Sequence, residues 1–443
     1  MTGFNATRRG FLQQTASAGA AAASASLLNS AHLFGAEKLA PIRLGIIGCG
    51  GMMGSHVQGI VSRKLPVSIA WLCDVDPGQI SATAERMKGF QTAAPKTTSR
   101  YEDVVMDKDV DAVIIATPHH WHAPIAVLAM QEGKDCYIEK PISHVYNEGH
   151  LIIRAAKKYG RIVQQGSQMR SSPVTEKAGR LLREGIIGEV KVARAWTAEP
   201  RSVVPPLPDS DIPPGVDYDR WLGPAPKRPF NKHRFHATWR MFQDYANGEI
   251  GDDGIHDIDM AVWGLGVTTL PKQITARGGH MVLHGSAGDY PDNMTVTCEY
   301  PDGRLLIYDN FPFTPYGQYG FDNGNVFLGT EGYMIFSRRG AFSVFLGQKG
   351  EPGPTEGSEL RRKRGYEEHM DDFLNSIRTR EPARANAEVA HRSCAVVHLG
   401  EIAFRTRGQL NFDPETEQFI GCDEANALLT KKYRAPFAIP EIT

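Results

Sequence analysis

Short apolar runs, rich in β-branched residues, alternate with longer mixed segments along the first part of the chain. Runs of this kind, bounded by turn residues, are typical of parallel strands that are buried on both faces. We predict strands over 42–48, 67–73, 111–117, 136–138 and 161–165, and helices over 55–62 and 123–132. Strands that alternate with helices indicate an α/β domain with a doubly wound parallel sheet.

The pattern changes after about residue 170. Strand-like runs, several of them alternating, occupy 190–197, 294–300, 304–310, 326–328 and 333–337, and helical patterns follow over 366–379 and 387–407. We therefore expect a second α/β domain with an open, mainly antiparallel sheet. A proline-rich stretch over 200–229 shows little periodicity, and connections of this length are commonly functional.

The N-terminus contains a twin-arginine pattern, Thr7-Arg8-Arg9-Gly10-Phe11-Leu12, followed by an Ala/Ser-rich run over 15–28. That run is too weakly apolar for a stable membrane span. We interpret residues 1–36 as an export signal of the twin-arginine type, which predicts a periplasmic or extracytoplasmic protein. The alternative is a disordered, alanine-rich tail with a chance arginine pair.

Charge and cysteine content exclude several classes of function. The 443-residue chain has 49 basic and 50 acidic residues, so it lacks the net charge expected of a nucleic-acid-binding protein or of one that binds anionic membranes. Its 6 cysteines are far apart and form no C-x-x-C pair. We expect buried thiols, with neither a disulfide framework nor a metal site.

A glycine-rich segment, Gly48-Cys49-Gly50-Gly51-Met52-Met53-Gly54, joins the first predicted strand to a helix. Such glycines allow a tight turn and let backbone N–H groups approach a pyrophosphate. The G-x-G-x-x-x-G spacing is one residue longer than the usual dinucleotide fingerprint. The next strand leads to Asp74, an acid suited to the ribose hydroxyls of NAD, and no Lys or Arg follows at once to bind a 2′-phosphate. The sequence therefore favours NAD over NADP.

Polar residues also follow two later strands of the predicted parallel sheet. Thr117-Pro118-His119-His120-Trp121-His122 comes after one, and Glu139-Lys140-Pro141 after the next. The carboxyl ends of parallel strands form the edge at which α/β proteins bind ligands. Pro141 favours an extended conformation at Lys140, which would aim its ammonium group at that edge. Taken alone, Lys140 could equally be an ordinary surface lysine.

A third candidate segment, over 248–260, contains Asp252 and His256 four residues apart. On a helix the two side chains share one face, and a carboxylate against an imidazole raises the basicity needed to remove a hydroxyl proton. The alternative is an exposed acidic helix with an ordinary histidine. A metal site is disfavoured, because no further His or Cys lies at ligand spacing.

Together the glycine-rich segment, the T-P-H-H-W-H segment, Glu139-Lys140-Pro141 and the Asp252/His256 pair resemble the Gfo/Idh/MocA family of oxidoreductases, in an exported bacterial branch. The resemblance implies an NAD(P)-binding Rossmann domain over 37–165 and a substrate and oligomerisation domain over 166–443. It also implies a homodimer or homotetramer. It makes Lys140, Asp252 and His256 the catalytic residues. The cofactor-binding residues that it implies are Gly48, Gly50, Gly51, Gly54, Asp74, Thr117, Pro118, His119, His122, Glu139 and Lys140.

The resemblance predicts hydride transfer between a nicotinamide and a secondary hydroxyl or carbonyl of a sugar, sugar derivative or cyclitol. Arg170, Trp239, Arg240 and Tyr245 are the candidate substrate contacts. Position 119 is often Asn or Asp in the family and is His here. Free NAD is scarce outside the cytoplasm, so we expect it to be tightly bound. The alternatives are an NAD-dependent glycoside hydrolase or lyase that oxidises its sugar transiently, and a non-catalytic sugar-binding protein.

Overall fold

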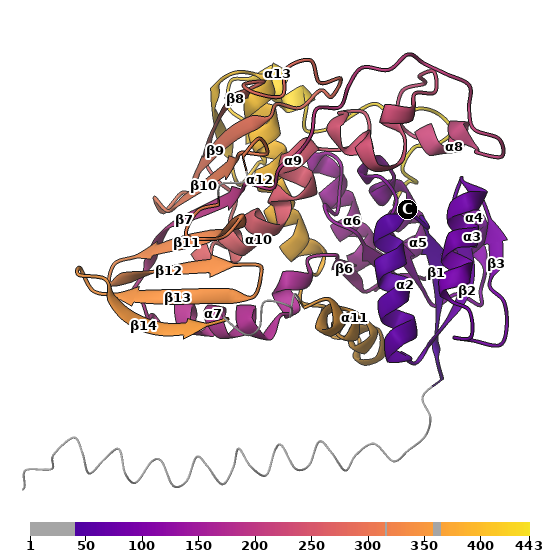
Figure 1. Ribbon diagram of the computed structural model, residues 1–443, viewed down its shortest axis with the longest axis horizontal. Coiled ribbons are helices and arrows are strands. Elements are labelled where there is room, and N and C mark those ends of the chain that lie inside the picture. The colour runs from indigo at the N-terminus through magenta and orange to yellow at the C-terminus, as the bar shows by residue number, and fades with distance from the viewer. Residues whose placement is uncertain (1–39, 315–316, 358–364) are drawn as a thin grey trace, which may run out of the picture. The chain divides into compact units, whose positions relative to one another are not determined.

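A computed structural model describes residues 40–314, 317–357 and 365–443 (Figure 1). The predicted export signal, residues 1–36, lies outside the described residues and stays a prediction. No helix among the described residues is both long enough and apolar enough to span a bilayer.

The N-terminal part is built on a parallel sheet of 6 strands in the order β3-β2-β1-β4-β5-β6. Its strands are β1 (Ile42–Ile47), β2 (Val67–Cys73), β3 (Lys96–Thr98), β4 (Ala112–Ile115), β5 (Asp135–Ile138) and β6 (Val163–Gln165). Its helices are α2 (Gly51–Arg63), α3 (Pro77–Arg86), α4 (Tyr101–Met106), α5 (His122–Gln131) and α6 (Tyr146–Tyr159). Every residue of β4 and β5 is buried, which explains the apolar runs over 112–115 and 136–138. The predicted doubly wound sheet is confirmed.

The second sheet has 10 strands in the order β14-β13-β12-β11-β7-β10-β9-β8-β15-β16. The strands are β7 (Val190–Thr197), β8 (Gln273–Gly279), β9 (Asn293–Glu299), β10 (Leu305–Asn310), β11 (Asn323–Gly329), β12 (Gly332–Ser337), β13 (Ala341–Leu346), β14 (Glu351–Glu356), β15 (Gln409–Asp413) and β16 (Gln418–Phe419). The pairing of β10 with β7 is parallel, and the other pairings are antiparallel. The predicted open, mainly antiparallel sheet is confirmed.

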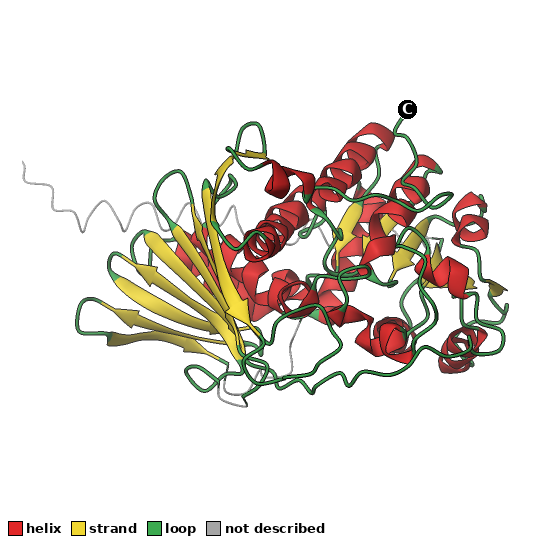
Figure 2. Ribbon diagram, turned by 90° about the horizontal axis from the view of Figure 1, so that it is seen from above, coloured by secondary structure: helices red, strands yellow, loops and turns green. Residues whose placement is uncertain are grey.

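The helices of the C-terminal part are α7 (Pro173–Arg183), α8 (Tyr218–Leu222), α9 (Gly248–Asp252), α10 (Gly254–Leu265), α11 (Tyr366–Thr379), α12 (Ala387–Arg405) and α13 (Asp423–Ala427). Of these, α7, α10 and α12 pack against one face of the sheet, as Figure 2 shows, whereas α11 packs on the apolar core of the parallel sheet. Short 3-10 turns lie at His119–Trp121, Gln168–Ser171, Lys232–Arg234 and His236–Met241. The predicted homodimer or homotetramer stays a prediction.

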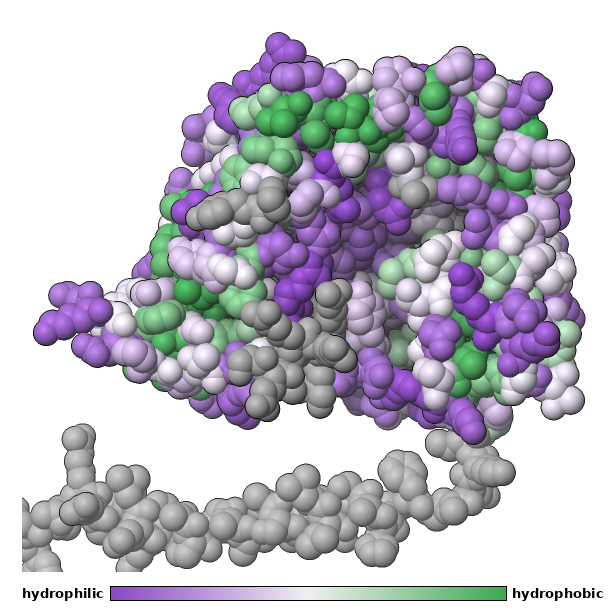
Figure 3. Space-filling view, in the orientation of Figure 1, coloured by the Kyte–Doolittle hydropathy of each residue, from purple (hydrophilic) through white to green (hydrophobic). Residues whose placement is uncertain are grey.

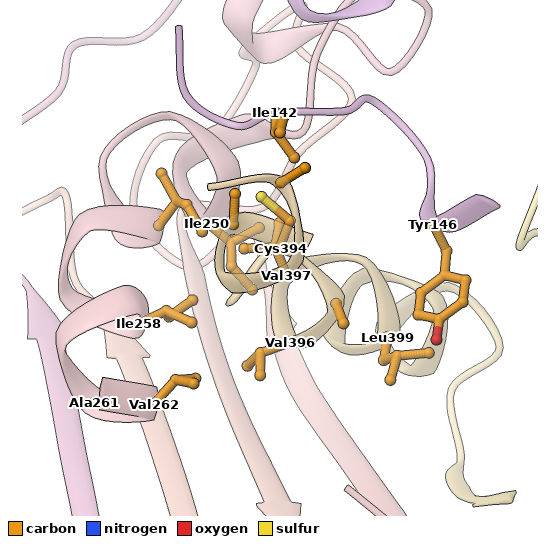
Figure 4. Close-up of a cluster of buried hydrophobic side chains, with 14 of the residues drawn as sticks. Ile142, Tyr146, Ile250, Ile258, Ala261, Val262, Cys394, Val396, Val397 and Leu399 are labelled. Atoms are coloured by element: carbon orange, nitrogen blue, oxygen red, sulfur yellow. The ribbon is translucent and has the colours of Figure 1, made fainter. Parts of the chain in front are cut away.

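The apolar core holds α9 and α10 in place. Ile250, Ile258 and Val262 are buried with Val396 and Val397 of α12, and Figure 4 shows these side chains gathered between the helices. Nearly every residue of α10 is buried, so the helix cannot shift without opening the core. The segment that carries Asp252 and His256 is therefore anchored by buried side chains in both helices, Ile250 in α9 and Ile258 and Val262 in α10.

Candidate active site

The glycine-rich segment forms a turn suited to a phosphate group. Gly48 has φ +86°, and a Cβ there would lie 2.8 Å from the backbone of Ala116. A Cβ at Gly50 or Gly51 would meet nothing within 4 Å, so the backbone is open at these positions. Helix α2 begins at Gly51 and has no side-chain cap and no acidic residue in its first turn. Its N-terminal N–H groups are thus available to an anion.

A cavity of about 420 Å³ lies against this turn. Among the residues that line it are Gly48, Gly50, Gly51, Asp74, Thr117, Pro118, Trp239 and Arg240. Open glycines, a helix N-terminus and an acid at the end of β2 fit a dinucleotide cofactor. Gly54 does not line the cavity; it lies within α2, where a Cβ would come within 3.1 Å of the Arg86 guanidinium. Gly50 and Gly51 are therefore open toward the cavity, and their predicted contact with a pyrophosphate stays a prediction.

Asp74 links the end of β2 to the glycine turn. Its carboxylate accepts the backbone N–H of Cys49 at 2.7 Å and that of Asp76 at 2.9 Å. Burial raises its pKa, which those two hydrogen bonds counteract. Each carboxylate oxygen can accept more than one hydrogen bond, so Asp74 can still bind a ribose hydroxyl. Its predicted contact with the cofactor stays a prediction.

Three other predicted cofactor residues are buried behind the cavity lining. The Nδ1 atom of His119 lies 3.1 Å from Oδ1 of Asn247. The His122 ring lies between the carbonyl oxygens of Pro141 at 2.7 Å and Thr117 at 2.9 Å. Glu139 is paired with His56 at 2.7 Å. In the described structure these side chains hold the loops together, and their predicted contacts with a cofactor stay predictions.

Lys140 and Asp252 meet at the centre of the site. The Lys140 Nζ atom donates to Oδ1 of Asp252 at 2.9 Å and also to the backbone carbonyl of Asp252. Arg240 donates to the same carboxylate from Nε, at 2.9 Å. Burial opposes the ionisation of Asp252, but the charges of Lys140 and Arg240 hold its pKa well below the usual value. Asp252 is therefore a carboxylate with two cationic hydrogen-bond donors, and Arg201 lies 3.9 Å from its other oxygen.

The prediction of one continuous helix through Asp252 and His256 is wrong. Helix α9 ends at Asp252, and α10 begins at Gly254. In a continuous helix the backbone N–H of His256 would donate to the carbonyl of Asp252. Lys140 binds that carbonyl instead, and the N–H of His256 donates to the carbonyl of Asp253 at 3.1 Å. Glycines on either side of the break lower the cost of the interruption.

His256 is buried, and its ring makes no hydrogen bond with any residue that the structure describes. The expected contact between this ring and the Asp252 carboxylate is thus not formed, because Lys140 and Arg240 bind the carboxylate. Burial, followed by the charges of Lys140 and Arg338, lowers the pKa of His256 to about 3. The imidazole is therefore neutral and has a lone pair free to accept a proton.

Two further groups near this centre were not predicted. Arg201 pairs with the buried Glu249 through contacts of 3.0 and 3.1 Å, and burial raises the pKa of Glu249 to about 7. Arg338 lies 3.3 Å from Asp257 and also pairs with Asp253. Glu249 lies among the glycines of the 248–254 stretch, so the sequence could have suggested it as a site residue. Arg201 and Arg338 come from an irregular connection and from beyond β12, where no sequence pattern marks them.

A second cavity, of about 300 Å³, borders the same centre and is lined by Asp252, Glu249, Arg201 and Arg240, among other residues. Arg240 lines both this cavity and the one at the glycine turn. Hydrophilic side chains are also gathered in a hollow near the middle of the face shown in Figure 3. The two cavities are therefore adjacent, since they share Arg240.

Two predicted substrate contacts are not brought to these cavities. Arg170 forms an ion pair with Asp259, with its Nε at 2.8 Å and a second nitrogen at 2.7 Å from the carboxylate. Tyr245 is fully buried, and its ring packs 4.7 Å from that of Trp221. Both residues are fixed by neighbours inside the protein, whereas Trp239 and Arg240 reach the cavity at the glycine turn.

Comparison with known families agrees with this arrangement. Residues 42–167 match the Gfo/Idh/MocA oxidoreductase family model for the NAD-binding Rossmann fold, and 196–311 with 354–439 match the model of that family's C-terminal α/β domain. This chain belongs to the Gfo/Idh/MocA oxidoreductase family. A Gfo/Idh/MocA protein binds its nicotinamide cofactor in the N-terminal domain, where the glycine turn and Asp74 lie.

The chain is also similar to individual proteins of known sequence or structure. Levoglucosan dehydrogenase of Pseudarthrobacter phenanthrenivorans is 27% identical over 67% of this chain and 73% of that protein. A glycosyl hydrolase family 109 protein of Shewanella pealeana is 28% identical over a shorter match, 34% of each chain. The crystal structure of aldose-aldose oxidoreductase from Caulobacter crescentus, complexed with glycerol, has a TM-score of 0.65 at 18% identity and covers 84% of this chain and 100% of that one. This last likeness shows the fold alone.

Proposed function

We propose that this protein is an NAD-dependent oxidoreductase that acts on a secondary hydroxyl or carbonyl of a sugar, sugar derivative or cyclitol. The observation that carries the proposal is the contact of Lys140 with Asp252, which lines the second cavity and binds Arg240, a residue that lines both cavities. The family supports an oxidoreductase that binds NAD. Levoglucosan dehydrogenase, a relative over most of the chain, supports a carbohydrate substrate.

The residues of the site have separate tasks in this proposal. A bound nicotinamide would supply hydride acceptance or donation. Lys140 has three N–H donors, of which two bind Asp252, so the third can donate to the substrate oxygen and stabilise its developing negative charge. Asp252 holds the Lys140 ammonium in place. The neutral ring of His256 accepts the hydroxyl proton in the oxidising direction and returns it in the reducing direction.

Two side chains beside the cavities are suited to a polyhydroxylated ligand: Arg240 lines both cavities, and Trp239 lines the one at the glycine turn. Arg240 lies 4.4 Å from the ring centre of Trp239, so an aromatic face and a guanidinium border the site together. Sugars present apolar C–H faces and hydroxyl edges, and such a pair can contact both. Trp239 and Arg240 are therefore the proposed substrate contacts.

A glycoside-cleaving enzyme with a closed redox cycle is the second candidate. It is favoured by Glu249, a buried carboxyl in the second cavity whose pKa is raised to about 7 by burial, because such a group can protonate a leaving aglycone. The glycosyl hydrolase relative points the same way. A non-catalytic sugar-binding protein is disfavoured, since both Lys140 and His256 are present.

Export of the protein, and retention of its cofactor, can be tested together. The full-length chain is expressed in a bacterium, and the protein is purified from the periplasmic fraction and dialysed extensively. We expect it to retain nicotinamide, and the absorbance near 340 nm to rise when a sugar or cyclitol is added. Release of p-nitrophenol from a nitrophenyl glycoside, with no net change in the nicotinamide, would favour the glycoside-cleaving enzyme. If the protein binds neither NAD nor NADP, both catalytic functions are contradicted. If it is confined to the cytoplasm, only the predicted export is contradicted.

A further inference from the structure

Two imidazoles and a carboxylate from distant parts of the chain meet outside the candidate active site. His150 lies in α6, His391 in α12 and Glu417 between β15 and β16. One nitrogen or oxygen atom from each lies within 4.8 Å of the others. None of the three residues lines the two cavities described above.

His391 is the unusual member of this cluster. Its side chain is only 6% exposed, and neither ring nitrogen has a hydrogen-bond partner among the residues that the structure describes. Buried polar atoms are normally satisfied, so an imidazole with two unsatisfied nitrogens indicates a missing partner.

The space beside His391 is maintained by a glycine. A Cβ at Gly149 would lie 2.1 Å from Nδ1 of His391, so any larger residue at this position would displace the ring. The buried ring is thereby held 4.2 Å, between ring centres, from that of His150. The packing brings the two imidazoles together despite the absence of a hydrogen bond between them.

The other two members, His150 and Glu417, are partly exposed to solvent, and Glu417 also accepts a hydrogen bond from a residue outside the cluster. The side chains of His150 and Glu417 contact each other and are 35% and 32% exposed, which leaves a path for an ion. The Tyr146 hydroxyl donates to Oε2 of Glu417 at 2.6 Å. Outer hydrogen bonds of this kind orient the ligands of metal sites.

We propose that His150, His391 and Glu417 bind a divalent transition-metal ion, with Zn²⁺ as the best fit. Two imidazoles and one carboxylate are a Zn²⁺ ligand set, whereas Ca²⁺ and Mg²⁺ prefer oxygen ligands and Cu⁺ prefers thiolates. Zn–ligand distances of about 2.1 Å place ligand atoms about 3.4 Å apart. Rotation of the two partly exposed side chains brings the donors to that spacing.

The ion would connect both halves of the molecule. His150 belongs to a helix of the nucleotide-binding part, whereas His391 and Glu417 belong to the C-terminal part. A metal bound there stabilises the folded chain, because its ligands come together only on folding. The sequence gives no signal for this metal site, because these ligands have no local spacing pattern.

The test uses the full-length chain without a histidine tag, treated with EDTA and dialysed. We expect titration with ZnCl₂ alone to show about one equivalent bound, and saturation to raise the melting temperature by several degrees. Co²⁺ should give visible absorption bands of a low-coordinate site with nitrogen and oxygen ligands. His150→Gln and Glu417→Gln change partly exposed side chains, and each should weaken Zn²⁺ binding at least about tenfold.

Tyr146→Phe, which removes only the outer hydrogen bond, should weaken binding less than either ligand substitution. His284→Gln removes an exposed imidazole outside the cluster and should leave Zn²⁺ affinity unchanged. The proposal is overturned if the wild-type chain binds no Zn²⁺, or if His150→Gln and Glu417→Gln both bind it as tightly as the wild type. Because binding and melting are measured without any substrate, failure here leaves the proposed oxidoreductase activity untouched.

Discussion

Replacing Lys140 with methionine is expected to lower turnover by roughly 10²-fold or more, while NAD still binds. Methionine keeps the length of the side chain but cannot donate to a substrate oxygen. It also leaves Asp252 without one of its cationic partners, since Arg240 alone still donates to Oδ1. The measurement is kcat with a sugar that reduces the cofactor, beside a fluorescence titration with NADH.

Loss of folding has to be separated from loss of chemistry in this variant. Lys157→Met is the matched control, because Lys157 is exposed and pairs with Glu388 at the surface. It should retain wild-type kcat and melting temperature. If Lys140→Met folds, binds NADH and still turns over at the wild-type rate, Lys140 has no part in the mechanism.

Replacing His256 with alanine should also lower turnover by roughly 10²-fold or more, because the proton acceptor is lost. His284→Ala, at an exposed site, is the control and should leave kcat unchanged. A His256→Ala protein with a normal melting temperature and a wild-type rate would show that the proton leaves by another route.

The pKa of His256 also predicts the shape of the pH profile. A base is active above its pKa and loses activity as the pH falls through it. Since burial and neighbouring charges lower the pKa of His256 to about 3, this residue should produce no loss of kcat/KM between pH 8 and pH 5. The pKa of Glu249, raised to about 7 by burial, lies inside that range. Any inflection of the kcat/KM profile near pH 7 should therefore disappear in the Glu249→Gln variant. The assignment of His256 would be contradicted by an inflection near pH 6.5 that persists in Glu249→Gln and is absent from His256→Ala.

Buried apolar runs made much of the fold predictable. The strand over 67–73 and the helix over 366–379 have the predicted bounds, because their apolar positions face a continuous core. Helix α6 was not predicted, although Ile152 and Ala155 are buried on one face at helical spacing. It also buries Glu148, a charged residue that lies 2.8 Å from Lys431 and 2.9 Å from Tyr433. Partners so distant in sequence could not be predicted from the helix itself.

Only the short motifs of the candidate site could be predicted from the sequence. Lys140 and Asp252 could each be chosen from their own segments, and the structure brings them into contact. Their contact also breaks the helix that the spacing of Asp252 and His256 had predicted. Arg170 has the residue type of a substrate contact, but the buried Asp259 binds it. Which partner an arginine binds depends on the tertiary fold and cannot be read from the neighbouring sequence.

Hydride transfer from a sugar carbon to the nicotinamide is the central claim, and isotope labelling tests it most directly. The sugar that raises the absorbance near 340 nm is supplied with deuterium on its carbon atoms, and the nicotinamide is then released from the protein and weighed by mass spectrometry. We predict reduced nicotinamide about one mass unit heavier than that formed from the unlabelled sugar, as direct carbon-to-nicotinamide transfer requires. Reduced nicotinamide of unchanged mass would contradict the account.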